Sequence, residues 1–160
     1  MSLIASILTC ANVVAESSAS SKKRVFEEAA QLFETQQGLD LNTIFDKLFA
    51  RERLGSTGMG DGVAIPHSRI EGLSEPACAF IRLAAPVPFD AFDEQPVKLI
   101  FVLLVPSDAN DTHLQILAEL AQMFSNAAFR RQLLAAADAQ ALYALLTGWR
   151  TEPEKEILTG

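Results

Sequence analysis

The sequence predicts an α/β or α+β fold in which helices cover a single β-sheet. Helix-spaced apolar patterns lie on both sides of several short apolar segments along the chain. One of these segments, 97–105, is continuously apolar, as expected of a strand that is buried on both faces. The 160 residues suffice for one ordinary domain, and no repeat or low-complexity linker divides them. We therefore expect a single domain over residues 1–160, with a core from about 21 to 147.

The first part of the chain predicts two helices. Apolar residues recur at helical spacing from Ser21 onward, and Gly38 is well suited to end that helix. Asp40 is expected to cap a second helix that ends near Arg53. The apolar segment 1–15 lacks the basic residues that open a secretion signal, so we expect an intracellular protein.

Strands are expected in the middle of the chain and further helices after it. Short apolar segments predict strands at 63–65, 77–83 and 97–105. The prolines between the last two segments argue against a central strand there. A long apolar helix is expected to begin at Asn110 or Asp111, and Asn126 and Asp138 are expected to cap two more. The polar tail 151–160 is expected to fray.

Composition excludes several classes of function. Lys and Arg number 13 and Asp and Glu 20, which gives a formal charge of −7. An acidic chain repels a phosphate backbone, so nucleic acid is not an expected partner. Cys10 and Cys78 stand alone, without metal-ligand spacing, which favours a reducing, cytoplasmic setting. No apolar run approaches the roughly 20 residues of a membrane helix.

A glycine-rich segment, 55–62, holds four of the eight glycines in the chain and predicts a loop. A nucleotide-binding P-loop needs a lysine after its second glycine, where Asp61 stands. A dinucleotide-binding motif needs a preceding strand and a different glycine spacing. A connecting loop whose glycines serve tight turns is the structural alternative to a functional segment.

His67 follows this segment at the end of the strand predicted at 63–65. Pro66 restricts the backbone before it, so the imidazole is held on a stiff segment. At cytoplasmic pH a histidine is substantially neutral and has a ring nitrogen lone pair that could attack phosphorus. The alternative is a packed or surface histidine without chemistry.

His113 is the other histidine of the chain and is expected in the first turn of the long helix. If that turn lies beside His67, its free N–H groups favour a phosphoryl group, and the second imidazole could hydrogen-bond one of its oxygens. A catalytic zinc site is disfavoured because no third ligand is marked. A serine hydrolase is disfavoured because no G-x-S-x-G motif occurs. A small-molecule-binding regulator without catalysis stays open.

The segment from Arg51 to His67, RERLGSTGMGDGVAIPH, resembles the signature of the fructose/mannitol-type IIA domains of the bacterial phosphoenolpyruvate phosphotransferase system (PTS). The blocks FDAFDEQPV, LLVP and THL follow in the order that the family has. The resemblance covers residues 21–146, and within the family it is greatest to the nitrogen-regulatory branch, which does not transport sugar.

This resemblance implies a mixed β-sheet between helices and roles for three residues. His67 would be phosphorylated on Nε2 by the phosphohistidine of an HPr-like carrier, NPr. His113 would stabilise the phosphoryl oxygens, and Arg51 would stabilise the phosphoryl group or a docked partner. The resemblance implies no metal or cofactor beyond the covalent phosphoryl group.

The resemblance also implies a regulatory output. The phosphorylation state of His67 would control binding to protein partners such as potassium-transport proteins or sensor kinases. The alternative within the family is a sugar-specific IIA subunit that passes its phosphate to a separate IIB protein. A membrane-embedded part is not expected.

Two positions depart from the family pattern. Asp61 stands where relatives commonly carry Asn, and Ser68 stands where Gly is common. A carboxylate near a phosphoryl dianion is unfavourable, so Asp61 is expected to point to solvent or to belong to a differently tuned site. Arg51, Arg53 and Arg69 cluster in sequence around the predicted anionic site.

Overall fold

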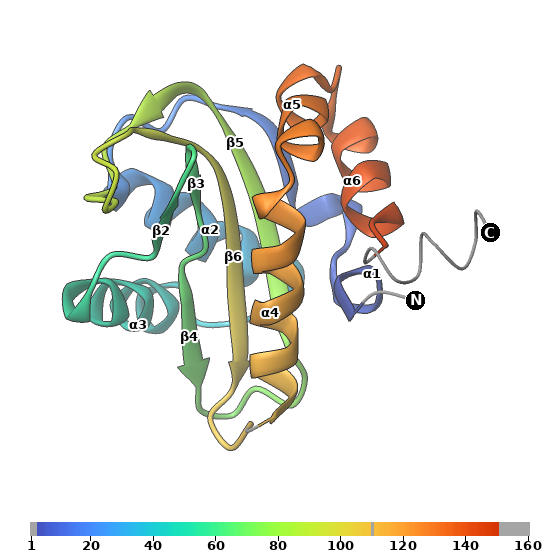
Figure 1. The fold of residues 1–160 in the computed structure, drawn as a ribbon. Helices are drawn as coiled ribbons and strands as arrows, with labels where there is room; N and C mark the ends of the chain where they lie inside the picture. The colour runs from blue at the N-terminus through green and yellow to red at the C-terminus, as the bar shows by residue number, and fades with distance from the viewer. Residues whose placement is uncertain (1–2, 110, 151–160) are drawn as a thin grey trace.

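The computed structural model describes residues 3–109 and 111–150, which form one mixed β-sheet between two layers of helices (Figure 1). The predicted fold class is thereby confirmed. The strands are β1 (Val13–Ser17), β2 (Gly58–Gly60), β3 (Val63–Ala64), β4 (His67–Ile70), β5 (Ala77–Val87) and β6 (Val97–Pro106). Their order is β1-β5-β6-β3-β2, and β4 also pairs with β6. β5 and β6 are antiparallel, whereas β3 and β4 run parallel to β6, and β1 runs parallel to β5.

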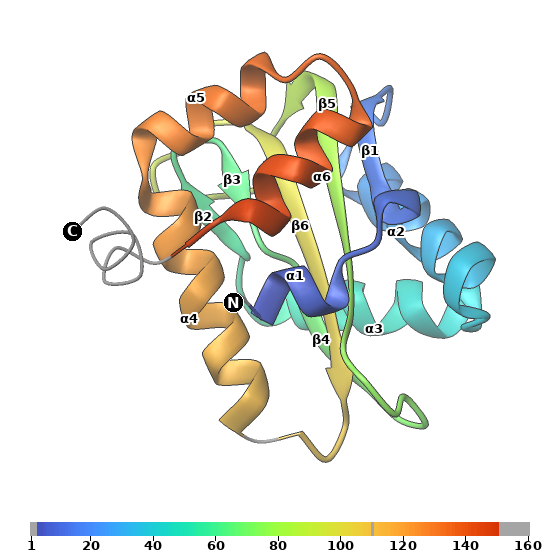
Figure 2. The same cartoon turned by 90° about the vertical axis from the view of Figure 1, so that its right-hand side faces the viewer.

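The helices divide between the two faces of the sheet, as Figures 1 and 2 show. One face is covered by α2 (Lys22–Gln37) and α3 (Leu41–Leu54). The other is covered by α1 (Leu3–Ile7), α4 (Asp111–Ser125), α5 (Ala127–Ala135) and α6 (Ala139–Gly148), with a 3-10 turn at Cys10–Asn12. Each face has its own buried apolar cluster, so the central strand β6 is almost continuously apolar.

The predicted helix ends are confirmed where the structure describes them. The N-caps whose side chains accept a backbone N–H from the first turn are Ser21, Asp40, Asn126 and Asp138. Gly38 follows α2 with a φ of 70°, in the left-handed region that favours glycine. α4 begins at Asp111, and the alternative cap Asn110 lies outside the described residues.

The folded core reaches further toward the N-terminus than the expected start near residue 21. Ile4, Leu8 and Val13 are buried in the cluster that α4 and α6 also form. β1 was not predicted, because a short edge strand with a Glu-Ser end has no clear alternation of apolar and polar residues. The polar tail 151–160 lies outside the described residues. Within the described part of the chain, no helix is long and apolar enough to cross a membrane.

β5 runs past its predicted end at Leu83, as far as Val87, and contains Pro86. The pairing with β6 is irregular between Arg82 and Val87. A proline is tolerated there because the ladder is already interrupted. The expectation that the prolines keep this segment out of a strand was therefore wrong for its first part.

The strand that carries His67 is divided in two. β3 and β4 both pair with β6 in one register, in which His67 lies opposite Leu103. The interruption falls at Ile65 and Pro66, since proline has no N–H for a sheet ladder. His67 therefore begins β4, whereas the sequence predicted that it ends the preceding strand.

Candidate functional site

The glycine-rich segment forms a β-hairpin where the sequence predicted a loop. β2 and β3 are antiparallel, and Asp61 and Gly62 form the turn between them, with φ values of 57° and 78°. Two left-handed residues make a type I′ turn, for which Asp-Gly is a favoured pair. At Gly58, a Cβ atom would lie 2.8 Å from Ala91 Cβ, so the close approach of the 88–96 loop requires glycine. These glycines shape the backbone of the site.

Asp61 is placed by this turn and not by the histidines. Its side chain is 67% exposed, and Oδ2 lies 3.9 Å from Arg130 Nη1. Its backbone N–H donates to Asp93 Oδ2 at 3.0 Å. The carboxylate thus has the solvent-facing orientation that was one of the two expectations.

A buried carboxylate, Glu52, holds the chain between α3 and the hairpin. Its side chain is 4% exposed and lies 3.0 Å from Lys22 Nζ. It accepts the Thr57 N–H at 3.1 and 3.2 Å and the Thr57 hydroxyl at 2.6 Å. Glu52 was not predicted from the sequence. The signal that could have found it is an acidic residue in the last turn of a helix, where the helix dipole disfavours it.

His67 is half-buried at the start of β4, and one of its nitrogens has a fixed partner. Nδ1 lies 2.7 Å from the carbonyl oxygen of Ile65. A carbonyl only accepts hydrogen bonds, so the proton of the neutral ring is on Nδ1 and the lone pair is on Nε2. An imidazole held in this way can act as a nucleophile through Nε2.

The pKa of His67 is lowered from its ordinary value of 6.5, chiefly because the ring is buried. The hydrogen bond to the Ile65 carbonyl opposes this shift of the pKa. The charges of Arg51 and His113 lower the pKa further, and that of Glu52 raises it. The lowered pKa keeps Nε2 unprotonated over a wider pH range. Because Arg51 and His113 both act on this ring, the structure brings the three predicted site residues into one electrostatic neighbourhood.

The three arginines that cluster in sequence have different contacts. Arg51, in the last turn of α3, donates from Nη1 to Gly55 O at 2.8 Å. Arg53 lies 5.5 Å over the ring of Phe49. Arg69 extends from β4 toward the loop before α4. The charge of Arg51 acts on the ring of His67, and Arg69 lies against His113, so these two arginines of the cluster are linked to the predicted histidines.

His113 meets Arg69 in the first turn of α4. Arg69 Nη2 lies 3.3 Å from His113 Nε2, and Nη1 donates to Ser107 O at 3.2 Å and to Ala109 O. A guanidinium only donates, so Nε2 accepts and the proton of a neutral His113 is on Nδ1. Among the residues that the structure describes, this buried Nδ1 has no hydrogen-bond partner. His67 and Arg69 are two residues apart on β4, so they lie on the same face of the sheet.

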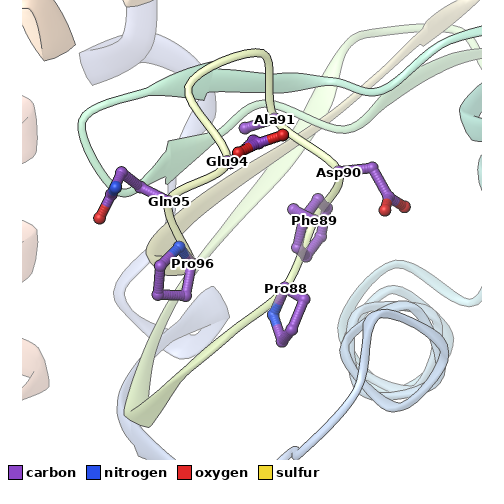
Figure 3. A pocket seen from close by; sticks show the side chains of 7 residues that line it. All are labelled: Pro88, Phe89, Asp90, Ala91, Glu94, Gln95 and Pro96. Atoms are coloured by element: carbon purple, nitrogen blue, oxygen red, sulfur yellow. The ribbon is translucent and has the colours of Figure 1, made fainter.

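A separate pocket of about 520 Å³ lies within the loop between β5 and β6 (Figure 3). All of its lining residues belong to 88–96, and they include the carboxylates Asp90 and Glu94 but no histidine or arginine. Asp90 pairs with Lys22 Nζ at 3.2 Å. This lining is not suited to an anion, and the pocket is not part of the site around His67.

The family described as "Phosphoenolpyruvate-dependent sugar phosphotransferase system, EIIA 2" matches residues 6–148. The chain belongs to this family of PTS phosphocarrier domains, which confirms the resemblance carried by the segment from Arg51 to His67. Its relatives place it in the nitrogen-regulatory branch of the family. The nitrogen regulatory protein of Pseudomonas aeruginosa is 49% identical over 127 residues, which cover 79% of this chain and 82% of the relative. That of Escherichia coli K12 is 39% identical over 136 residues, covering 84% and 83%.

One solved structure agrees with this assignment, and a more distant one shares the fold. The nitrogen regulatory protein IIA-Ntr from Neisseria meningitidis is 48% identical, with a TM-score of 0.86, and the match covers 91% of this chain and 99% of that one. IIA mannitol from Escherichia coli is 18% identical, with a TM-score of 0.73 and coverage of 87% and 98%. At that identity the second comparison shows the shared fold alone.

Proposed function

We propose that Nε2 of His67 accepts a phosphoryl group from the phosphohistidine of an HPr-like carrier, NPr. The observation that carries the proposal is the 2.7 Å contact of His67 Nδ1 with the Ile65 carbonyl, which leaves Nε2 as the nucleophile. The lowered pKa of His67 supports it, because the attacking nitrogen has to be unprotonated. The protein acts as a single domain over residues 1–160, in the cytoplasm.

The transfer is an in-line displacement at phosphorus. The lone pair of His67 Nε2 forms the new N–P bond while the N–P bond of the donor breaks, and the donor nitrogen leaves with the electron pair. His67 keeps its Nδ1 proton against the Ile65 carbonyl. The bonds broken and formed are alike, so the step needs no nucleotide. The contribution of the protein is alignment and stabilisation of charge.

Two side chains stabilise the transferred group. Arg51 supplies positive charge beside His67, and the first turn of α4 supplies N–H groups and the imidazole of His113. In the resting structure His113 Nε2 accepts from Arg69. His113 therefore has to give up this bond and take a proton on Nε2 before it donates to a phosphoryl oxygen.

Phosphorylation also serves regulation in this proposal. It adds about −1.5 to −2 charge at His67, so a partner whose surface charge fits the unphosphorylated site no longer fits the phosphorylated one. The targets are proteins such as potassium transporters or sensor kinases. The similarity to nitrogen regulatory proteins supports this output. If a target were captured equally by native protein and by His67→Asp, a charge-controlled switch would be excluded.

The exchange of His67 for alanine tests the transfer itself. Native protein incubated with phosphoenolpyruvate, enzyme I and NPr is expected to acquire acid-labile phosphate, and His67→Ala is expected to acquire none. His113→Ala is the control, since it keeps the nucleophile and should still be labelled at a lower rate. Acid-labile label on His67→Ala contradicts the proposal.

A sugar-specific IIA subunit is the second candidate. One observation favours it: a fructose-specific EIIA component from Haloferax volcanii is 38% identical over 107 residues, covering 67% of this chain and 70% of the relative. Such a subunit passes its phosphate to a cysteine of a separate IIB protein. Phosphorylated native protein incubated with purified fructose- and mannitol-type IIB distinguishes the candidates, because a regulatory protein leaves both unlabelled.

A further inference from the structure

A chain of hydrogen bonds connects a buried carboxylate to the ring of His67. Glu52 accepts both the N–H and the hydroxyl of Thr57, the latter at 2.6 Å. The carbonyl of Thr57 accepts the N–H of Ile65 at 3.0 Å. The carbonyl of Ile65 accepts from His67 Nδ1 at 2.7 Å. The chain thus begins on α3, crosses the segment before β2 and ends at the start of β4.

Glu52 is the charged residue at the start of this series of hydrogen bonds. Its side chain is 4% exposed, and Lys22 Nζ lies 3.0 Å from Oε1. Burying a carboxylate is costly unless it is paired and hydrogen-bonded, and both conditions are met here. Hydrogen bonds to a carboxylate are shorter and stronger than those to a neutral amide, which agrees with the short bond from the Thr57 hydroxyl. The charge makes this anchor firmer than a neutral side chain of the same shape.

This series of hydrogen bonds acts by holding each residue in place, and not by moving charge or protons. The N–H and the C=O of Thr57 belong to different peptide groups, as do those of Ile65, so no single conjugated amide links Glu52 to the imidazole. Each residue instead holds the next in place. Ile65 is the point where this matters, because it lies between β3 and β4 and precedes Pro66, which has no N–H for the sheet. The Thr57–Ile65 bond supports the strand where its own ladder is interrupted.

We propose that Glu52 is a positioning residue for His67: through Thr57 and Ile65 it fixes the carbonyl that keeps the proton on Nδ1 and leaves Nε2 free. The consequence for phosphoryl transfer rests on the proposed function, but the geometry does not. A merely structural role for Glu52 predicts lower stability without a change in the tautomer of His67. The two roles therefore differ in a property of the unphosphorylated protein.

The test exchanges Glu52 for glutamine, which keeps the shape and removes the charge. The tautomer of His67 is measured from the NMR shifts of its ring nitrogens, and the initial rate of labelling from phosphorylated NPr is measured in parallel. Native protein is expected to hold the Nδ1–H tautomer. In Glu52→Gln the Nε2–H tautomer should become detectable, and the labelling rate should fall about tenfold because Nε2 is less well aligned for attack. A native tautomer and a native rate in folded Glu52→Gln overturn the proposal.

Glu119 offers a matched control because it is a second buried carboxylate, on α4, that accepts the N–H of Leu3 at 3.0 Å. Glu119→Gln removes a buried charge outside the chain of bonds and should leave the His67 tautomer unchanged. A tautomer change of equal size in Glu119→Gln also overturns the proposal, since the effect is then a general loss of stability.

If Glu52→Gln does not fold, the tautomer of His67 is measured in variants of Thr57 instead. Thr57→Val removes the hydroxyl bond to Glu52 and keeps the backbone bonds, so a smaller change of the His67 tautomer in the same direction is expected. Thr57→Ser keeps the hydroxyl that Thr57→Val lacks, so it should show the native tautomer. Identical tautomers in Thr57→Val and Thr57→Ser contradict the proposal. If native protein is not labelled at His67, the proposed function fails while the tautomer measurements still decide the role of Glu52.

Discussion

The two histidines of the site are held in different ways. A main-chain carbonyl fixes His67, with Nδ1 2.7 Å from Ile65 O. The exposed side chain of Arg69 holds His113, with 3.3 Å between Nη2 and Nε2. The Ile65 carbonyl lies between β3 and β4, which both pair with β6, so it has no freedom to turn away. A surface arginine exchanges partners easily. In the proposed transfer, the first arrangement suits a nucleophile of fixed tautomer and the second suits a group that adjusts to an arriving charge.

The difference follows from the elements that carry the two residues. His67 begins a strand that pairs with β6 in the sheet, so its backbone is fixed on one side by the ladder. His113 lies in the first turn of α4, where backbone N–H groups have no partner within the helix. Arg69 links the two places, because it starts on β4 and bonds the loop that leads into α4.

Removal of His113 is expected to have the largest effect of the three changes that address this comparison. His113→Ala should lower the initial rate of labelling from phosphorylated NPr about a hundredfold, as is typical when one donor to a developing charge is lost. His67 keeps its free Nε2, so labelling should persist. His113→Gln keeps a donor and should recover part of the rate. An unchanged rate in His113→Ala would mean that only one histidine takes part.

Removal of Arg69 should have a smaller effect, because it frees His113 without deleting it. Arg69→Gln is expected to lower the labelling rate about threefold to tenfold through loss of alignment. Arg53→Gln is the matched control, because it removes the same charge from a side chain that lies over Phe49. Equal losses in the two variants would assign the effect to net charge and not to the contact with His113.

The smallest effect is expected from pH, and it concerns His67. Its pKa in the folded protein lies below 6.5, so the unfolded chain binds more protons as the pH falls through that value. The native protein therefore loses stability as the pH falls from 6.5 to the lowered pKa, and this loss is complete below it. Urea unfolding at a series of pH values measures the slope, and His67→Gln should remove this contribution. An identical slope in His67→Gln would mean that burial does not shift the pKa of the ring.

Much of the fold could be predicted because the relevant signals are local. Ser21, Asp40, Asn126 and Asp138 cap helices as expected, since each cap bonds an N–H three residues away. The apolar run that forms β6 was also predicted, because a strand buried on both faces has a continuous pattern. The short strands β1 and β4 were not predicted, because their pairing partners β5 and β6 lie far away in sequence. β2 pairs with the adjacent β3, but its Gly-Met-Gly sequence has the composition of a loop.

The candidate site divides in the same way. His67, His113 and Arg51 were predicted from the sequence, and in the fold the charges of Arg51 and His113 act on the ring of His67. Glu52 and the bonds of Arg69 were not predicted. Their partners are Lys22 in another helix and the loop before α4, and no spacing along the chain marks such contacts.

The sequence by itself determined which groups can do chemistry: two imidazoles, one after a rigid proline, and the family signature around His67. Residue types and short spacings are enough for that, because they act through the nearby backbone. Only the tertiary structure showed that the Ile65 carbonyl is the partner of His67 Nδ1, that His113 is held by Arg69, and that Glu52 is connected to the ring. The last two of these properties depend on hydrogen bonds between separate segments of the chain, which the folded sheet brings together.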